Sequence, residues 1–293
     1  MPPTGPVDLK KEVNFASLKD RNVLITGGVS GLGKTMVKMF ARHGANIVVG
    51  DVQDNLGAAL EKELGGDAKI KYVHVDVTSF ESQVAMLRQA LEFFPRNEVD
   101  IFVPCAGVLG APTNVAPADP SELANLKSPP ADMNGRIISV NLTGVFNGVM
   151  LVARYGFGLH KNPKPEPTKS VVLIASLAGY CGAEAPSNTR QPSMALNAVA
   201  PFYVETPMTE QAVPVLKQLG IPIASTEHVT EAVARLSTDE NAYGRSIFVM
   251  PEGLSDGGDD AAGGEGGQSF STKAFGEHWA VLVNGPMSDS IVA

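Results

Sequence analysis

A glycine-rich turn between an apolar run and a helical pattern constrains this chain more than any other feature. The stretch from Asn22 to Thr35 reads NVLITGGVSGLGKT. Glycines let a backbone approach a phosphate closely, and the first turn of a helix presents unpaired N–H groups with a partial positive charge. The stretch therefore predicts a site for a phosphorylated ligand.

Two phosphate-binding patterns overlap in this turn. Residues 28–35 read G-x-x-x-x-G-K-T, the P-loop pattern, in which Lys34 would reach the outer phosphates and Thr35 would bind magnesium. Residues 26–33 read T-G-x-x-x-G-x-G, which suits a dinucleotide pyrophosphate. On this second pattern the cofactor-binding residues are Thr26, Gly27, Ser30, Gly31, Leu32 and Gly33. The turn alone does not choose between the two ligands.

Apolar runs alternate with helical patterns along most of the chain. Runs predicted as strands cover residues 22–26, 46–51, 70–77, 99–107, 170–176, 196–200 and 246–250. Helical patterns cover residues 33–44, 55–66, 82–94 and 138–159. Continuous Val, Ile and Leu runs indicate strands buried on both faces, as in a parallel sheet covered by helices. We predict an α/β fold with a doubly wound parallel sheet, Rossmann-like, in a single domain.

The domain boundaries follow from composition. The 293 residues are enough for one large α/β domain, which we place at residues 18–251, after an N-terminal tail at 1–17. Residues 252–293 begin with a Gly- and Asp-rich stretch that cannot bury enough apolar surface to order itself. We therefore predict a linker and a C-terminal tail there.

Charge and cysteine content exclude several classes of function. The net charge is -8 and the basic residues form no run, so we expect no nucleic-acid or anionic-membrane partner. The first residues contain no apolar signal segment, and we see no apolar stretch long enough to span a membrane. Cys105 and Cys181 lack metal-ligand spacing, and the histidines do not cluster. We expect a soluble, cytoplasmic protein without a metal site.

Asp51 bears on the choice of nucleotide. It ends an apolar run eighteen residues after Gly33, where a dinucleotide fold places an acid that accepts hydrogen bonds from the adenosine ribose. A P-loop enzyme would instead need an acid for magnesium, for which Asp51 or Asp76 could serve. A carboxylate at the ribose would repel a 2′-phosphate, and neither the turn nor Val52 and Gln53 supply a cation to receive one. The predicted cofactor is NAD, with NADP less favoured.

Six landmarks in order resemble the short-chain dehydrogenase/reductase family. They are TGGVSGLG in the turn, VDV at 75–77, CAG at 105–107, VNLTGVF around Asn141, IASLAGY around Ser176 and NAVAPFYVETPM from Asn197. The resemblance covers roughly Leu18 to Pro251 and is greatest to fungal-type alcohol dehydrogenase members. It implies an NAD(P)-dependent oxidoreductase acting on a small alcohol or ketone.

The resemblance also assigns roles to residues. Asp76 and Val77 would flank the adenine, Ala106 and Gly107 would pass beside the cofactor, and Thr206 would touch the nicotinamide carboxamide. Pro201 and Val204 belong to the same cofactor-binding segment. Ser176 would hydrogen-bond the substrate, and Asn141 would hold a water in a proton relay. Under this reading the P-loop match is a coincidence.

One departure from the family is serious. The family's proton transfer needs a Tyr-x-x-x-Lys pair on the helix after the fifth strand, and no such pair occurs anywhere in this chain. Roughly twenty residues are missing near Gln191 to Met194, either by a genuine deletion or by a misjoined splice site. We therefore predict that the helix after the fifth strand is deleted. Its loss would expose an apolar patch, which the Gly- and Pro-rich loop, the C-terminal tail or another chain would have to cover.

Few residues could replace the missing acid. Tyr180 lies four residues after Ser176 and is the nearest candidate. Lys161, Lys164 and Lys169 precede the fifth strand, at the opposite edge of the sheet, and we interpret them as solvated charges. Two main hypotheses remain. The first is an impaired or altered dehydrogenase with a small-molecule substrate, which could form a homo-oligomer; the second is a cofactor-binding pseudoenzyme or a non-redox enzyme. A P-loop nucleotide hydrolase is the third.

Overall fold

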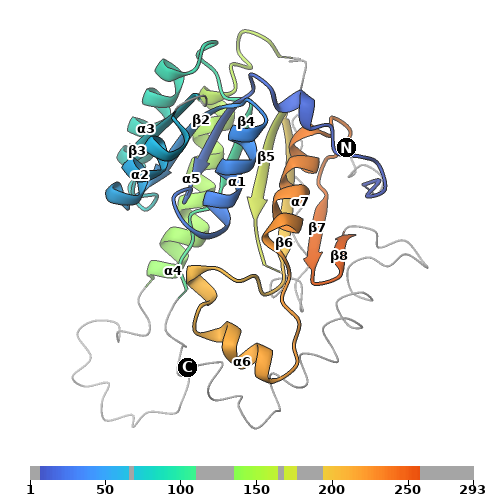
Figure 1. The fold of residues 1–293 in the computed structure, drawn as a ribbon. Coiled ribbons are helices and arrows are strands. Elements are labelled where there is room, and N and C mark those ends of the chain that lie inside the picture. Colours follow the sequence, from blue (N-terminus) through green and yellow to red (C-terminus); the bar gives the residue numbers. More distant parts are fainter. Residues whose placement is uncertain (1–6, 66–68, 110–134, 164–167, 177–193, 258–293) are drawn as a thin grey trace, which may run out of the picture.

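A computed structural model describes residues 7–65, 69–109, 135–163, 168–176 and 194–257, and Figure 1 shows their arrangement. Its centre is one eight-stranded sheet with the strand order β3-β2-β1-β4-β5-β6-β7-β8. The strands are β1 (Asn22–Thr26), β2 (Asn46–Asp51), β3 (Lys69–His74), β4 (Ile101–Pro104), β5 (Lys169–Ile174), β6 (Met194–Pro201), β7 (Ser246–Met250) and β8 (Gly253–Asp256). The first seven strands are parallel, which confirms the predicted doubly wound sheet.

Helices cover both faces of this sheet. On one face α1 (Gly31–Arg42), α2 (Asp54–Leu64) and α7 (Thr226–Thr238) bury one apolar cluster. On the other face α3 (Phe80–Phe93) packs with a long helix built from α4 (Arg136–Ile138), α5 (Val145–Leu151) and two π-helical segments, Ser139–Gly144 and Val152–Gly156. The short helix α6 (Ala212–Gln218) lies beyond the carboxyl edge of the sheet (Figure 1).

The sequence missed β8. This strand pairs antiparallel with β7, with Met250 opposite Gly253. It lies past residue 251, where composition alone placed the start of a linker. The tight reversal uses Gly253 at a φ of +143°, a conformation that side chains other than glycine's rarely adopt. A four-residue strand rich in small and polar residues has no apolar pattern by which to recognise it.

Strands β5 and β6 pair in register from Lys169 opposite Met194 to Ile174 opposite Val199. The nineteen residues between Ile174 and Met194 therefore connect two neighbouring parallel strands. Parallel strands ordinarily need a crossover of a dozen or more residues. Residues 177–193, where the helix deletion was predicted, lie outside the described residues. Leu173 and Leu196, which pack with the cluster on the α3 face, are only partly buried.

The long helix Arg136–Gly156 sits close to the sheet because its inner face is small. A Cβ added at Gly144 would come within 2.9 Å of the Val77 carbonyl, and one added at Gly148 within 3.1 Å of the Phe102 ring. Within the described part of the chain this is the one helix that could cross a membrane by length and composition, which the sequence analysis did not expect. A helix packed in the core of a soluble domain passes the same test, so the absence of a membrane partner stays a prediction.

Part of the predicted N-terminal tail is packed against the domain. Val7 is buried, and its N–H donates to Asp256 Oδ2 at 2.6 Å. The guanidinium of Arg235 on α7 donates to the carbonyls of Asp8 and Lys11 at 3.0 and 2.6 Å. These contacts attach residues 7–11 to α7 and β8. Hydrogen bonds to backbone carbonyls leave no pattern in the sequence, so this attachment could not be predicted from it.

The interpretation of Lys169 as a solvated charge is wrong. Its side chain is 2% exposed, and Nζ lies 2.7 Å from Asp100 Oδ1 and 2.9 Å from Glu98 Oε1. Arg21 and Arg96 also pair with Asp100, whose Oδ2 accepts the Asn22 N–H. Lys169 does lie at the amino edge of the sheet, as expected, but there it joins a buried ion-pair network between β1, β4 and β5.

Candidate active site

The candidate site lies at the carboxyl edge of the sheet, where the strand order reverses. Strand β1 pairs with β2 on one side and with β4 on the other. Strands β1 to β3 follow one another toward one side of the sheet, whereas β4 to β8 follow one another toward the other side, so the strand order reverses between β1 and β4. Open α/β sheets bind ligands at such a switch point, outside the carboxyl ends of the strands. The glycine-rich turn that follows β1 lies at this point.

The turn is built for close approach of backbones. Gly27 has a φ of +69°, and a Cβ there would lie 2.5 Å from the Cα of Ala106. A Cβ at Gly33 would lie 2.0 Å from the Gly27 carbonyl oxygen. Ser30 begins α1 without a side-chain cap, so the first N–H groups of a twelve-residue helix have no capping acceptor from that residue. The turn and helix therefore fit the pyrophosphate of a dinucleotide.

The two side chains that a P-loop requires are engaged elsewhere. Lys34 Nζ forms an ion pair with Glu63 of α2 at 3.3 Å. Thr35 Oγ1 donates to the Gly31 carbonyl one helical turn back, at 3.2 Å. Neither arrangement presents a ligand for magnesium or for a terminal phosphate, so the geometry of this turn favours the dinucleotide pattern.

Thr26 joins the ends of β1 and β4. Its carbonyl accepts the Cys105 N–H at 3.1 Å, and its hydroxyl accepts the Ala106 N–H at 3.4 Å. Cys105 is half-buried, and burial raises the pKa of its thiol to about 12. Cys105 therefore stays a neutral thiol, and the backbone of Ala106 is fixed beside the glycine-rich turn.

Asp51 ends β2 next to this turn, as predicted. Its residue is buried, and Oδ2 lies 3.4 Å from the N–H of Val29. Its other oxygen, Oδ1, accepts the backbone N–H of Gln53 at 3.1 Å and the Gln53 side-chain amide at 3.3 Å. The carboxylate therefore faces the loop that would carry the cofactor.

Asp76 and Val77 follow β3 on the same edge. Asp76 Oδ1 accepts the hydroxyl of Thr78 at 2.7 Å and its N–H at 2.9 Å, and these hydrogen bonds lower the pKa of the carboxyl. Val77 is buried, and its carbonyl accepts Gln83 Nε2 at 2.6 Å. Val77 thus offers an apolar surface beside an ionised carboxylate.

Asn141 lies in the π-helical segment of the long helix and reaches the loop after β4. Its Oδ1 accepts the Val108 N–H and its Nδ2 donates to the Val108 carbonyl, both at 2.9 Å. The Asn141 oxygen also lies 3.6 Å from the position of a Cβ on Gly107. The Asn141 side chain thus anchors the loop of Ala106 and Gly107, a role that its sequence context did not indicate. A proton relay through Asn141 stays a prediction.

Ser176 is exposed and lies two residues beyond the end of β5, at the functional edge. Tyr180, the proposed replacement acid, lies outside the described residues. Tyr203 lies after β6, where it packs edge-on against Phe202 with ring centroids 5.1 Å apart. Burial raises the pKa of Tyr203, which makes its hydroxyl a weaker acid.

The segment after β6 lies over the glycine-rich turn. Pro201 is buried at the end of β6, and Val204 is buried beside Ala224. The Thr206 side chain lies 3.5 Å from the position of a Cβ on Gly31. Thr206 is held by a reciprocal capping box with Thr209 at the start of a 3₁₀ turn. These contacts place Thr206 beside the glycine-rich turn, and its contact with a nicotinamide stays a prediction.

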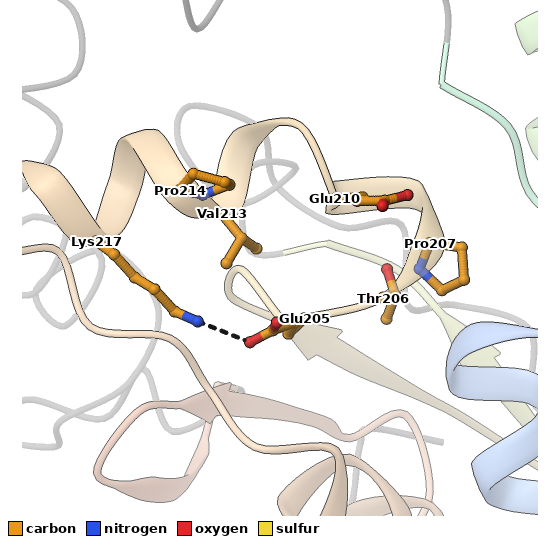
Figure 2. A pocket seen from close by; sticks show the side chains of 7 residues that line it. All are labelled: Glu205, Thr206, Pro207, Glu210, Val213, Pro214 and Lys217. Atoms are coloured by element: carbon orange, nitrogen blue, oxygen red, sulfur yellow. Dashed lines mark hydrogen bonds and ion pairs between the residues drawn. The ribbon is translucent and has the colours of Figure 1, made fainter.

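An open groove of about 570 Å³ begins at Thr206 and runs along α6 (Figure 2). An exposed ion pair between Glu205 and Lys217 crosses it, with the charged atoms 3.0 Å apart. The groove lining is Glu205, Thr206, Pro207, Glu210, Val213, Pro214 and Lys217. The sequence did not indicate this groove.

Comparison with known proteins decides the family. The family model described as short chain dehydrogenase matches residues 21–188, more than half of the chain. The chain belongs to the short-chain dehydrogenase family. This short-chain dehydrogenase is 32% identical over 294 residues to 5′-hydroxyaverantin dehydrogenase of Dothistroma septosporum, covering 89% of this chain and 94% of that one. It is 30% identical over 255 residues to the mitochondrial borneol dehydrogenase of Lavandula x intermedia, covering 79% and 90%.

Solved structures agree on the fold. The 3-ketoacyl-(acyl-carrier-protein) reductase of Brucella melitensis, complexed with NADH, matches with a TM-score of 0.64 at 22% identity, over 80% of this chain and 98% of that one. A short-chain dehydrogenase of the glucose/ribitol type from the same organism matches with a TM-score of 0.64 at 24% identity, over 80% and 96%. The present short-chain dehydrogenase therefore shares the fold of these proteins.

The predicted cofactor residues of this short-chain dehydrogenase converge on one edge, whereas its predicted catalytic residues are only partly described. The turn, Asp51, Ala106 and Thr206 surround the switch point. Tyr72 and His74 on β3 and Asp54 at the start of α2 were missed. Both β3 side chains contact Asp54, and the Tyr72 hydroxyl also contacts the Asp51 carbonyl. Their alternation along β3 was the available signal, because Tyr72 and His74 share one face of that strand.

Proposed function

We propose that this protein binds NAD(H) in preference to NADP(H) and catalyses hydride transfer on a small secondary alcohol or ketone only weakly. The observation that carries the cofactor preference is Asp51, a buried carboxylate facing the glycine-rich turn. Two ribose hydroxyls could donate to its oxygens, whereas a 2′-phosphate would meet a negative charge. The relatives named for 5′-hydroxyaverantin and borneol support an alcohol as the substrate class.

The residues fit a dinucleotide along the whole edge. Gly27 to Gly33 and the start of α1 would hold the pyrophosphate, and Asp51 the adenosine ribose. Asp76 and Val77 would border the adenine, Ala106 and Gly107 the middle of the cofactor, and Pro201, Val204 and Thr206 the nicotinamide end. The bound nicotinamide supplies the acceptor or donor of hydride. The chain itself must orient the substrate and move the proton.

Proton transfer is where this chain is deficient. A positioned acid or base contributes about 10²–10⁴-fold to a rate, and the Tyr-x-x-x-Lys pair that supplies it in the family is absent. Ser176 lies at the carboxyl edge of the sheet, where its hydroxyl could hydrogen-bond a substrate oxygen. Tyr203, packed against Phe202 with a raised pKa, is poorly suited to act as a base at neutral pH. We therefore propose cofactor binding with little turnover.

Binding and turnover are tested separately. In a fluorescence titration with NADH and NADPH, we expect NADH to bind more tightly, and Asp51→Ala to weaken NADH and narrow the difference. Glu92→Ala, which removes an exposed carboxylate of α3, is the control and should leave both affinities unchanged. Equal or tighter NADPH binding by the wild-type chain would refute the proposed preference.

Turnover is measured on a panel of secondary alcohols and ketones with saturating NAD⁺ or NADH. We expect negligible rates with intact cofactor binding, which is the behaviour of a pseudoenzyme. Rates typical of alcohol dehydrogenases would refute the proposal that hydride transfer is impaired. Tyr180→Phe would then be decisive, because loss of activity in that variant would identify Tyr180 as the acid.

We also propose that a second copy of the chain covers the long helix. Its outer side carries Ile138, Leu142, Phe146 and Met150, exposed by 61, 65, 62 and 42% and spaced four residues apart. No charged residue occurs between Arg136 and Arg154. An uncharged apolar stripe of this length is typical of a protein interface. Sedimentation should show a dimer that Phe146→Asp dissociates; a monomeric wild type would contradict this.

A further inference from the structure

A tyrosine, an aspartate and a histidine connect both ends of the turn that follows Asp51. The Tyr72 hydroxyl lies 2.8 Å from the backbone carbonyl oxygen of Asp51 and 2.8 Å from Asp54 Oδ1. His74 Nδ1 lies 2.8 Å from the same Asp54 oxygen. Tyr72 and His74 come from β3, whereas Asp51 ends β2 and Asp54 begins α2. One hydroxyl therefore bridges the start and the end of a four-residue turn.

Further hydrogen bonds close the same turn. The Asp51 carbonyl also accepts the Val75 N–H at 2.9 Å, and it shares the single hydroxyl proton of Tyr72 with Asp54 Oδ1. The Asp51 carboxylate accepts from the Gln53 backbone and side chain. The orientation of the carboxylate and the path of residues 51–54 are thus fixed together.

Gly57 provides the space that Tyr72 needs. It lies inside α2 and is buried, and a Cβ at this position would come within 2.3 Å of the Tyr72 ring. Glycine is among the least favourable residues inside a helix. Its presence here lets the ring lie flat against α2, so that the hydroxyl reaches Asp51.

The ionisation states suit this arrangement. Hydrogen bonds from Tyr72 and then His74 lower the pKa of Asp54, so its carboxylate is charged at neutral pH. Burial, followed by the hydrogen bond to Asp54, raises the pKa of Tyr72, so its hydroxyl remains a donor. The Tyr72 hydroxyl consequently joins the charged Asp54 carboxylate to the backbone carbonyl of Asp51.

We propose that Tyr72, Asp54 and His74 act as a clamp that sets the discrimination between NAD(H) and NADP(H). The clamp holds the Asp51 carboxylate toward the ribose. It also fixes the conformation of the turn 51–54, which ends at the second carboxylate, Asp54. A 2′-phosphate beside Asp51 would have to open this turn and approach both carboxylates. The three residues are positioning residues, and the inference rests on the proposed cofactor preference.

The test measures the dissociation constants of NADH and NADPH for the full chain and two clamp variants. Tyr72→Phe keeps the ring on Gly57 and removes the hydroxyl; we expect NADH to bind about fivefold more weakly and NADPH to change little, from the worth of one hydrogen bond. Asp54→Asn removes the exposed second charge; we expect NADPH to bind about threefold more tightly, from the repulsion lost. Tyr155→Phe, on the outer side of the long helix, should change neither.

The ratio of the two constants distinguishes the outcomes. If the NADPH and NADH dissociation constants lie closer together in both clamp variants than in the wild type, the clamp is supported. Equal loss of both affinities in Tyr72→Phe would mean a purely structural role, and unchanged constants in both variants would likewise overturn the inference. If Tyr72→Phe fails to fold, the exposed Asp54→Asn decides alone. A wild type that prefers NADPH but whose ratio shifts would refute the proposed preference and keep the clamp; a wild type that binds neither cofactor refutes both.

Discussion

Replacing Lys169 with methionine should strongly destabilise the domain. Lys169 Nζ lies within 3 Å of both Asp100 and Glu98 at a side chain that is 2% exposed. Removing one partner of a buried ion pair costs about 3–5 kcal/mol. Arg21, Arg96 and the Asn22 N–H still contact Asp100, so we expect the lower end, about 3 kcal/mol. Methionine preserves the length and most of the packing of the side chain.

The free energy of unfolding is measured in urea at pH 7, together with Tm. A loss of about 3 kcal/mol should lower Tm by roughly 6–12 °C in a domain of this size. Lys161→Met, which removes an exposed lysine before the same strand, is the matched control. A Lys169→Met protein as stable as the control would refute this account of the network.

The stability that Asp100 contributes to the fold should fall as the pH is lowered. Burial alone would raise the pKa of Asp100, but the charge and hydrogen bond of Lys169, with Asn22 and Arg21, outweigh it and lower the pKa. A lowered folded-state pKa stabilises the fold above the unfolded value of about 3.9, and that stability is lost as pH falls through the folded pKa. In Lys169→Met the pKa of Asp100 rises, so acid unfolding should begin at a higher pH than in the wild type.

Three further predictions follow from other contacts. Gly33→Ala should weaken NADH binding at least tenfold, because the new Cβ would lie 2.0 Å from the Gly27 carbonyl oxygen. Gly135→Ala, whose Cβ would meet nothing within 4 Å, is the control and should leave NADH binding unchanged. Equal NADH affinities of the two variants would contradict the close approach at Gly33. Cys105 should resist iodoacetamide at pH 8 in the folded protein, since its pKa is about 12; mass spectrometry showing ordinary thiol reactivity would contradict this. Arg235→Met should speed tryptic cleavage after Lys10 and Lys11, because the Asp8 and Lys11 carbonyls lose their donors; an unchanged rate would mean that α7 does not hold this segment.

Repeating local patterns made the core of the fold predictable from sequence. Seven apolar runs and the glycines after the first of them specify a parallel sheet with a dinucleotide turn, and both are present. The position of Asp51 followed from its place at the end of an apolar run. Each of these features depends on residues close together in the chain, so a single sequence contains the information.

Features that depend on distant partners could not be predicted. Whether Lys169 is solvated or buried depends on Asp100, which lies 69 residues away. The side chain of Asn141 is paired with the Val108 backbone, and no sequence pattern marks a backbone acceptor. Tyr72 gained its role from Gly57 and Asp51 together. In each case the missing information was a tertiary contact.

The register of β5 on β6 has a consequence for how the chain folds. Residues 169 and 194 face each other there, whereas β1 and β4 join residues 23 and 101, roughly three times as far apart along the chain. Closing the longer loop costs about 1 kcal/mol more chain entropy, so the parallel pair β5–β6 should form before β1–β4. Pulse-labelling hydrogen exchange during refolding should protect the amides of residues 170–174 before those of residues 101–104, and the reverse order would exclude this sequence of events.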